Sequence, residues 1–219
     1  MNRPHEVLSP GVCFVTDGAA TAGRPLLEVV RSAVAGGADL IQLREKDRPG
    51  GALLDLAKGV VAICRESGWH CRVIVNDRLD VALAAKAAGI HLPAAGLPVD
   101  GVRRLAGKRF LVGRSVHSLA EAQKAQKEGA DYIIFGPVFA TPGKAAFGEP
   151  LGPAALRRAA ESLRIPVWAI GGIDPATAAE LAGMPIAGVA AIRAIAAAPD
   201  PAGAVRALRA ALGRTPVPP

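Results

Sequence analysis

Short apolar runs rich in β-branched residues recur along the chain, and each is followed by a longer segment whose apolar residues have helical spacing. Such continuous apolar runs are typical of strands buried on both faces of a parallel sheet. We predict eight of these strands, at residues 12–16, 39–43, 72–75, 90–92, 110–113, 132–135, 167–170 and 188–192. The segments predicted to be helices are residues 25–35, 51–67, 79–88, 98–105, 119–128, 153–163, 175–181 and 201–212.

This alternation predicts an α/β fold with a single (β/α)8 TIM barrel, because parallel strands joined by helices close into a barrel or form a doubly wound open sheet. The open sheet is disfavoured, since no Gly-x-Gly-x-x-Gly follows the first strand and polar residues follow most of the strands. The chain has 219 residues, which is short for two domains, and we expect one domain over residues 1–212. The proline-rich residues 213–219 predict a disordered tail.

The amino-acid composition argues against one class of partner, nucleic acid. Hydrophobic residues make up 51% of the chain and aromatic residues 4%, which suits helices on a parallel sheet and not a base-stacking surface. The formal net charge is +7, but the arginines are scattered over predicted helices, as on a solvated surface. We therefore expect no nucleic-acid partner, whereas an acidic small molecule such as a phosphate ester is compatible with this charge.

Cysteine usage and hydropathy predict a cytoplasmic protein. The three cysteines have no C-x-x-C spacing, and their odd number argues against a disulfide framework. No long apolar core follows the first charged residues, and the most apolar later stretch, residues 186–198, is interrupted by Arg193. We expect neither a signal peptide nor a membrane span.

Polar residues at the ends of the predicted strands are the candidates for a site, because a parallel barrel gathers its chemistry there. Gln42, Arg44 and Lys46 end the second strand with the same orientation, and two cations beside an amide would bind a carboxylate or a phosphate. The alternative is a solvated loop with an ion pair through Glu45. Lys144, past the sixth strand, would add a further cation.

Two other strand ends carry candidate ligands. Asn76 and Asp77 follow the third strand, where Asn76 is expected to contact a ligand and Asp77 either caps the next helix or holds a metal or a ring nitrogen. Gly171 and Gly172 follow the seventh strand, and their N–H groups would approach a phosphate closely beside the start of a helix at Asp174.

His117 is the candidate acid-base group, since it lies just past the fifth strand beside Ser115 and Ser118, which can orient a ring nitrogen. The other histidines lie in different units, and none has a neighbouring cysteine or histidine at metal-ligand spacing, so we expect no zinc site. We expect His91, at the end of the fourth strand, to be a buried core residue.

Several motifs, taken in order, resemble those of the thiamine-phosphate synthase and thiazole tautomerase superfamily. The resemblance extends from about residue 12 to about residue 212. It rests on Val15-Thr16-Asp17, Gln42-Leu43-Arg44-Glu45-Lys46, Val75-Asn76-Asp77-Arg78, His91-Leu92, Ser115-Val116-His117-Ser118, Gly136-Pro137-Val138-Phe139-Ala140-Thr141-Pro142 and Ala169-Ile170-Gly171-Gly172-Ile173.

The resemblance implies a TIM barrel that binds a thiazole phosphate, and it leaves two reactions. Synthases join a pyrimidine methyl pyrophosphate to the thiazole phosphate with Mg²⁺, whereas tautomerases shift a proton to aromatise a carboxythiazole phosphate. Synthases have a glutamine and a magnesium-binding aspartate where this chain has Ala94 and Gly96, and a serine where it has Arg193. The His-Leu-Pro form at Pro93 and the Gly-Arg-Ser-Val-His-Ser run are similar to the tautomerase branch.

We therefore expect a thiazole tautomerase without a metal, in which His117 moves the proton. The substrate-binding residues would be Gln42, Arg44, Lys46, Asn76, Asp77, Ser115, Thr141, Lys144, Gly171, Gly172 and Arg193. The alternative is a thiamine-phosphate synthase, with Asp77 holding Mg²⁺ and with Arg44, Lys46 and Lys144 neutralising the pyrophosphate. A second alternative is a noncatalytic phosphate-binding regulatory protein. The resemblance also implies a homodimer.

Overall fold

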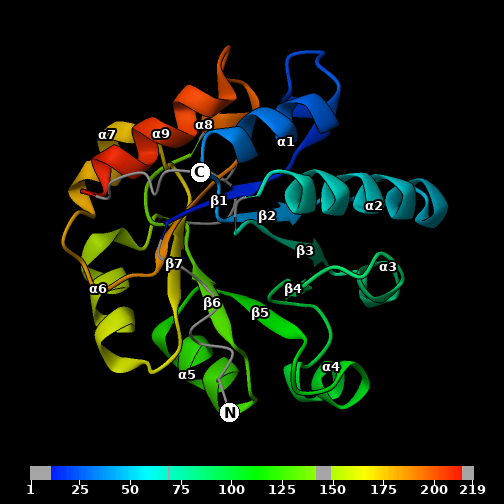
Figure 1. Ribbon diagram of the computed structural model, residues 1–219. Coiled ribbons are helices and arrows are strands. Elements are labelled where there is room, and N and C mark those ends of the chain that lie inside the picture. Colours follow the sequence, from blue (N-terminus) through cyan, green and yellow to red (C-terminus); the bar gives the residue numbers. More distant parts are fainter. Residues whose placement is uncertain (1–10, 69, 142–148, 214–219) are drawn as a thin grey trace.

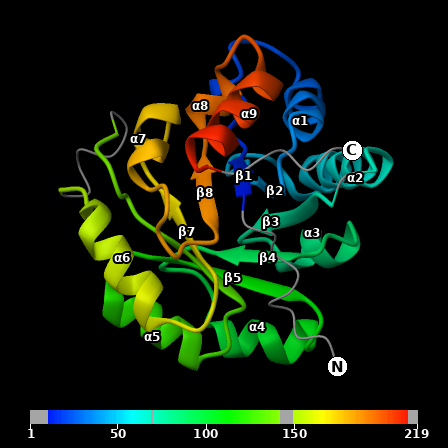
Figure 2. The ribbon, with the colours of Figure 1, turned by 60° about the vertical axis from the view of Figure 1, so that its left-hand side comes forward.

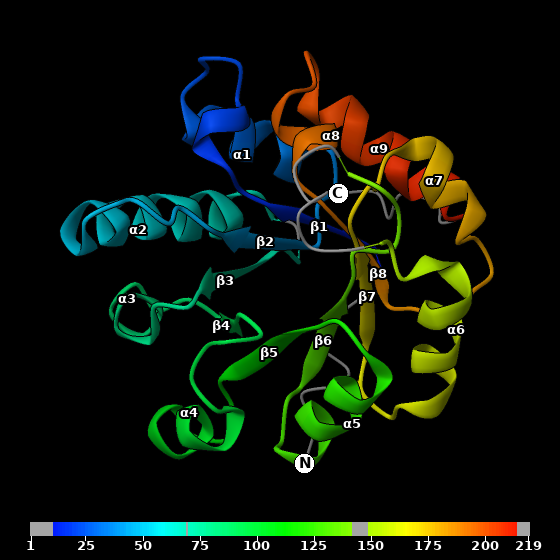
Figure 3. The same cartoon turned by 180° about the vertical axis from the view of Figure 1, so that it is seen from behind.

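Eight parallel strands form a closed barrel in which each strand pairs with the next and β8 pairs with β1. The computed structural model describes residues 11–68, 70–141 and 149–213. Figures 1 and 3 show the strands at the centre and the helices around them. The predicted TIM barrel is confirmed. The strands are β1 (Gly11–Val15), β2 (Leu40–Leu43), β3 (Arg72–Asn76), β4 (Gly89–Leu92), β5 (Leu111–Val116), β6 (Tyr132–Phe135), β7 (Val167–Ile170) and β8 (Gly188–Ala191).

The helices follow the predicted order, with two departures. The third ends several residues earlier than predicted, since Lys86 takes a left-handed backbone at φ 55°. The alanine-rich segment after β8 forms an unpredicted short helix, α8 (Arg193–Ala196). Beyond it, α9 (Pro201–Ala211) packs between α1 (Leu26–Ala35) and α7 (Pro175–Glu180) (Figure 2). The elements are η2 (Gly18–Ala20), α1 (Leu26–Ala35), α2 (Gly50–Glu66), α3 (Leu79–Ala84), α4 (Val99–Ala106), α5 (Leu119–Lys127), α6 (Gly152–Ser162), α7 (Pro175–Glu180), α8 (Arg193–Ala196) and α9 (Pro201–Ala211).

Side chains alternate between the inside of the barrel and the layer under the helices, as the pleat of each strand requires. The larger apolar cluster packs the helices against the outer face of the barrel. Inside, the ring of Tyr132 lies over Gly113, where a β-carbon would come within 2.1 Å of it. The inner cluster comprises Cys13, Val15, Leu40, Ile74, Leu111, Tyr132, Ile134, Trp168 and Ala190.

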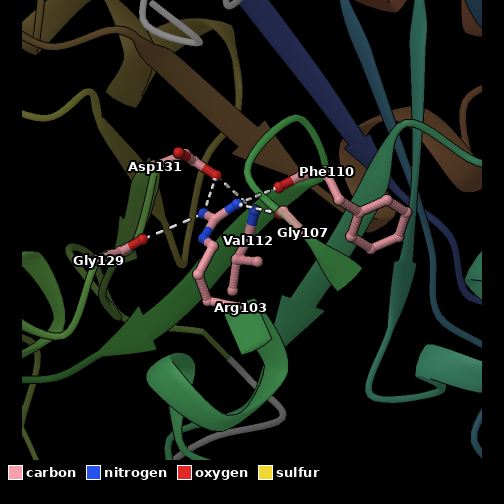
Figure 4. A network of polar contacts seen from close by, with 6 residues as sticks. All are labelled: Arg103, Gly107, Phe110, Val112, Gly129 and Asp131. Carbon is pink, nitrogen blue, oxygen red and sulfur yellow. Dashed lines mark hydrogen bonds and ion pairs between the residues drawn. The ribbon is translucent and has the colours of Figure 1, made fainter. Parts of the chain in front are cut away.

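Two buried aspartates fix the amino-terminal ends of the strands. Asp131, just before β6, accepts hydrogen bonds from the Val112 amide and from Arg103, whose guanidinium also reaches the carbonyls of Gly107, Phe110 and Gly129 (Figure 4). These groups come from α4, β5 and the chain before β6, so one side chain joins three segments of the barrel.

The same arrangement recurs four strands away. Asp39, just before β2, accepts from the Val12 amide at 2.8 Å and from Arg209 of α9, which also donates to the carbonyl of Gly37. In both places a Gly-Ala-Asp run precedes the strand. We call these two aspartate–arginine networks the amino-terminal rim.

The limits of the domain stay a prediction. Residues 1–10 and 214–219, which include almost all of the expected disordered tail, lie outside the described residues. Among the described helices, none is long and apolar enough to cross a lipid bilayer.

Candidate active site

The carboxyl ends of the strands, which we call the mouth, collect most of the predicted site residues. The strand register places Val15 beside Gln42 and Asn76 beside His91, each pair on neighbouring strands. Because Val15 belongs to the inner cluster, Gln42 occupies an inward position next to it. The mouth therefore brings together side chains from neighbouring strands.

Two cations follow β2, and neither has an ion-pair partner in the part of the chain that the structure describes. Gln42 is 3% exposed, and its buried side-chain nitrogen has no hydrogen-bond partner among the described residues. Arg44 is half-buried, Lys46 is exposed, and within residues 11–68, 70–141 and 149–213 neither forms a recorded ion pair. Glu45 does not neutralise them, because its carboxylate accepts from the Thr16 hydroxyl at 2.7 Å and from the Gly18 amide. The alternative of an ion pair through Glu45 is not found.

Asp77 is held at the mouth in a left-handed backbone conformation, with φ 60°, which aspartate tolerates better than most residues. Its amide donates to the carbonyl of His91 at 2.9 Å, and its side chain is exposed. The helix-cap alternative for Asp77 is wrong, because Arg78 occupies the N-cap position of α3 and no side chain caps that helix. Asn76 beside it is half-buried at the end of β3.

The loop after β4 lies against Asp77. A β-carbon on Gly96 would come within 3.1 Å of Oδ1 of Asp77 and 2.8 Å of Cδ of Pro93, so this position faces the carboxylate and has little room. Arg114 of β5 holds the loop by donating to the carbonyls of Leu97 at 2.6 Å and Ala94 at 2.7 Å. Sequence reasoning missed Arg114, although an arginine next to an apolar strand was a signal that it has a specific partner.

His117 lies just beyond β5 and is exposed. Its Nδ1 is 2.5 Å from the carbonyl oxygen of Gly136, and its amide donates to Glu121. The two serines do not orient its ring as expected. Ser118 instead caps α5 by accepting from the Glu121 amide at 3.1 Å, and the hydroxyl of Ser115 is 2.8 Å from Nε2 of His91.

His91 is buried, as predicted, and both of its ring nitrogens have partners. Nδ1 lies 3.2 Å from the hydroxyl of Tyr132, and Nε2 contacts Ser115. Burial, with a smaller contribution from the charge of Arg114, lowers the pKa of His91 to about 3. Burial also raises the pKa of the Tyr132 phenol well above its ordinary value. Both side chains are therefore neutral at physiological pH.

The loop after β7 brings Gly171 and Gly172 to the mouth with left-handed backbones, at φ 100° and φ 64°. They also allow the chain after β6 to pack closely, because β-carbons there would lie 2.5 Å from Pro137 and 2.6 Å from the carbonyl oxygen of Ala140. The start of α7 is already occupied by its own cap, in which Asp174 and Thr177 bond each other's amides. The expected contribution of that helix start to an anion site stays a prediction.

The remaining candidates follow β6 and β8. Arg193 is exposed at the first position of α8, immediately after β8, and Thr141 is half-buried after β6. Lys144 lies outside the described residues. Within the part of the chain that the structure describes, no group of three or more histidine, cysteine, aspartate or glutamate side chains is placed to hold a metal ion.

Comparison with known proteins identifies the family and corrects the expected reaction. The thiamine monophosphate synthase family model matches residues 12–195. The chain is 43% identical to the thiamine-phosphate synthase of Chlorobium luteolum, covering 98% of this chain and 97% of that protein. It is 42% identical to the thiamine-phosphate synthase of Roseiflexus castenholzii, covering 90% and 86%.

Comparison with solved structures agrees with this family assignment. The thiamine phosphate pyrophosphorylase from Pyrococcus furiosus superposes with a TM-score of 0.86 at 35% identity, covering 95% of this chain and 98% of that chain. A 3-hexulose-6-phosphate synthase, at 20% identity and a TM-score of 0.66, shares the fold alone.

These relatives overturn the expectation of a thiazole tautomerase, an isomerase, because they are named for a transferase. The expectation gave too much weight to Ala94, Gly96 and Arg193. Mg²⁺ is commonly held by one or two carboxylates together with substrate phosphates and water, so the loss of one carboxylate does not exclude a synthase. From its family match and its end-to-end similarity to these relatives, the chain belongs to the thiamine monophosphate synthase family.

Proposed function

We propose that this protein is a thiamine-phosphate synthase, which joins a pyrimidine methyl pyrophosphate to a thiazole phosphate. The observation that carries the proposal is the similarity, at 42–43% identity over almost the whole length of both chains, to proteins of that name. The geometry of the mouth supports it, since two cations that have no ion pair among the described residues and a carboxylate follow the neighbouring strands β2 and β3, at the end where a TIM barrel binds its substrates.

Arg44 and Lys46 are the proposed ligands of the pyrophosphate. In the reaction, a bond forms from the thiazole to the methylene carbon of the pyrimidine as the bond from that carbon to a pyrophosphate oxygen breaks. Negative charge then accumulates on the departing pyrophosphate, and fixed cations stabilise it most where water is partly excluded. The half-buried Arg44, whose planar guanidinium can bind two oxygens at once, is suited to this task. Lys144 is proposed as a further cation.

Asp77 is the proposed protein ligand of Mg²⁺. Its exposed carboxylate, held at the mouth by the left-handed backbone, is a hard oxygen donor of the kind that Mg²⁺ selects. Gly96 faces this carboxylate and adds no second one, so the rest of the coordination would come from pyrophosphate oxygens and water. When bound there, Mg²⁺ would offset the charge of the leaving pyrophosphate.

The other predicted residues are proposed to bind the organic parts of the substrates and the thiazole phosphate. The buried nitrogen of Gln42, which has no partner among the described residues, and the half-buried Asn76 suit hydrogen bonds to a ring, because a buried polar group costs free energy until it is paired. The amides of Gly171 and Gly172, with Arg193 and Thr141, suit the phosphate. His117 is proposed as a substrate contact, without the proton transfer that a tautomerase would need.

The direct test is a coupling assay. Purified protein mixed with both substrates and Mg²⁺ is expected to form thiamine phosphate and pyrophosphate in equal amounts, and omission of either substrate or chelation of the metal should stop both. Absence of product under all conditions, with the fold verified by circular dichroism, would refute the proposal. In that case, binding of thiazole phosphate by calorimetry would favour a noncatalytic phosphate-binding protein.

We further propose that the enzyme is a cytoplasmic homodimer. Support comes from the free state of Cys13, Cys64 and Cys71 and from the family resemblance. Sedimentation at micromolar concentration should give twice the mass of the chain, and a monomer would contradict the dimer.

A further inference from the structure

We propose that Tyr132 is a positioning residue which, acting through His91, fixes the hydroxyl of Ser115 as a hydrogen-bond donor toward the mouth. The three side chains form a continuous series from the barrel interior to the mouth. The Tyr132 hydroxyl is 3.2 Å from Nδ1 of His91, and Nε2 of His91 is 2.8 Å from the Ser115 hydroxyl. The role given to Ser115 in substrate binding rests on the proposed function. Which group donates and which accepts in each of these two hydrogen bonds does not depend on it.

The imidazole has one donor and one acceptor. A neutral histidine carries its proton on one ring nitrogen, so one of the two hydrogen bonds must be donated by His91 and the other accepted. His91 is 1% exposed and both of its ring nitrogens contact side chains with hydroxyl groups, so the buried ring has no charged partner there and is neutral. A protonated ring, which would donate in both directions, is therefore excluded at the pH of the cell.

Tyr132 decides between the two directions. Its hydroxyl is completely buried, and among the described residues His91 is its recorded hydrogen-bond partner. If His91 donated from Nδ1, the phenolic hydrogen would point into the apolar interior without an acceptor, which buried hydroxyls avoid. Tyr132 therefore donates to Nδ1, the imidazole proton lies on Nε2, and His91 donates to Ser115.

This direction of the hydrogen bonds makes the hydroxyl of Ser115 a donor. Its oxygen already accepts from His91, so its own hydrogen is free to be donated elsewhere. Ser115 is half-buried near the end of β5, and its neighbour across the sheet is Ile134, a member of the inner cluster. A hydroxyl fixed as a donor favours an anionic oxygen over a group that must itself donate. Tyr132 thus selects, from the barrel interior, for the phosphate or pyrophosphate oxygen of a substrate.

The experiment reads the tautomer of His91 directly. With ¹⁵N-labelled histidine, long-range ¹H–¹⁵N correlation spectra distinguish a protonated Nε2 from a protonated Nδ1, and a His91→Gln sample assigns the signal among the four histidines. We expect the Nε2–H form of His91 from pH 5 to pH 8. In the Nδ1–H form, His91 would donate to Tyr132 and accept from Ser115. That result would overturn the proposal, whether or not the protein couples its substrates.

Kinetics then test the consequence. Tyr132→Phe keeps the ring over Gly113 but removes the donor, so we expect KM for the pyrophosphate substrate to rise threefold to tenfold with kcat changed less than twofold. Ile133→Val, on the outward face of the same strand, is the matched control and should leave KM unchanged. Ser115→Ala should raise KM as well, and adding Tyr132→Phe to it should cause no further loss. Additive losses in the double variant would show that Tyr132 does not act through Ser115.

Discussion

The two ends of the barrel differ in whether their charged side chains are paired within the described part of the protein. At the amino-terminal rim, Asp39 and Asp131 are buried, and each is bonded to an arginine and to a backbone amide. At the mouth, Arg44 and Lys46 have no recorded ion pair within the described residues, and the nitrogen of Gln42 has no partner there. Satisfied charges hold segments together, and unsatisfied ones can bind a ligand. Charge alone therefore does not mark the site; the charges proposed to bind substrate are those at the mouth that have no ion pair among the described residues.

The largest expected effect is on stability, at the amino-terminal rim. Arg209→Met leaves the carboxylate of Asp39 without its guanidinium, and we expect the free energy of unfolding to fall by about 3–5 kcal/mol. Coupling activity per folded molecule should change less than twofold. Chemical denaturation and the assay measure the two effects. Arg206→Met on the same helix, whose partner Asp200 is exposed, is the control and should cost less than about 1 kcal/mol.

The next effect is on activity, at the mouth. Arg44→Ala removes the half-buried cation proposed for the pyrophosphate, so we expect kcat/KM to fall by about 100-fold, equivalent to about 2.7 kcal/mol, with the melting temperature unchanged. Arg48→Ala changes an exposed arginine of the same loop and should stay within twofold. Equal losses in both variants would mean that the loop attracts substrate by general charge rather than by Arg44.

A third effect is the response of stability to acid. Burial lowers the pKa of His91 in the folded protein to about 3, from its ordinary value of 6.5. As pH falls below 6.5, the unfolded chain binds a proton that the folded one does not, so stability is lost down to about pH 3. Between pH 7 and pH 5, we expect the wild type to lose about 2 kcal/mol more than His91→Gln. Equal losses in urea titrations at the two pH values would place His91 in a solvated environment.

The smallest expected effect concerns the metal. Pro93→Gly with Gly96→Asp relieves the contact of Pro93 with a side chain at position 96 and adds a carboxylate facing Asp77. Compared with Pro93→Gly alone, the double variant should need threefold to tenfold less Mg²⁺ for half-maximal coupling, about 0.7–1.4 kcal/mol. An unchanged magnesium requirement would move the metal away from Asp77.

The sequence predicted the barrel well because short apolar runs alternate with segments of helical spacing along the chain. It also placed Gln42, Arg44, Asn76 and Asp77 correctly at the strand ends, since period-2 alternation is a local property. The partners of these residues could not be predicted. The pairing of Ser115 with His91 and Tyr132 depends on the register of three strands, and the contact of Gly96 with Asp77 depends on how a loop folds back.

The expected reaction failed for a related reason. A missing aspartate at position 96 was interpreted as a missing metal site, although the contribution of one ligand depends on what substrate and water supply. Similarly, Ser118 next to His117 in sequence was interpreted as its partner, whereas the backbone turns there and Ser118 caps α5. The side chains of residues adjacent in sequence at a strand end point in different directions. Only the three-dimensional fold shows which side chains contact each other.

The most direct measurement is a crystal structure of the protein soaked with magnesium pyrophosphate. We predict that the anion lies at the mouth against the guanidinium of Arg44, with Mg²⁺ on the carboxylate of Asp77 and the hydroxyl of Ser115 on a pyrophosphate oxygen. The arginines of the amino-terminal rim should keep their aspartate partners unchanged. A pyrophosphate bound at that rim, or at the mouth without contact to Arg44 and Asp77, would contradict this account, in which the rim stabilises the fold and Arg44 and Asp77 at the mouth bind the substrate.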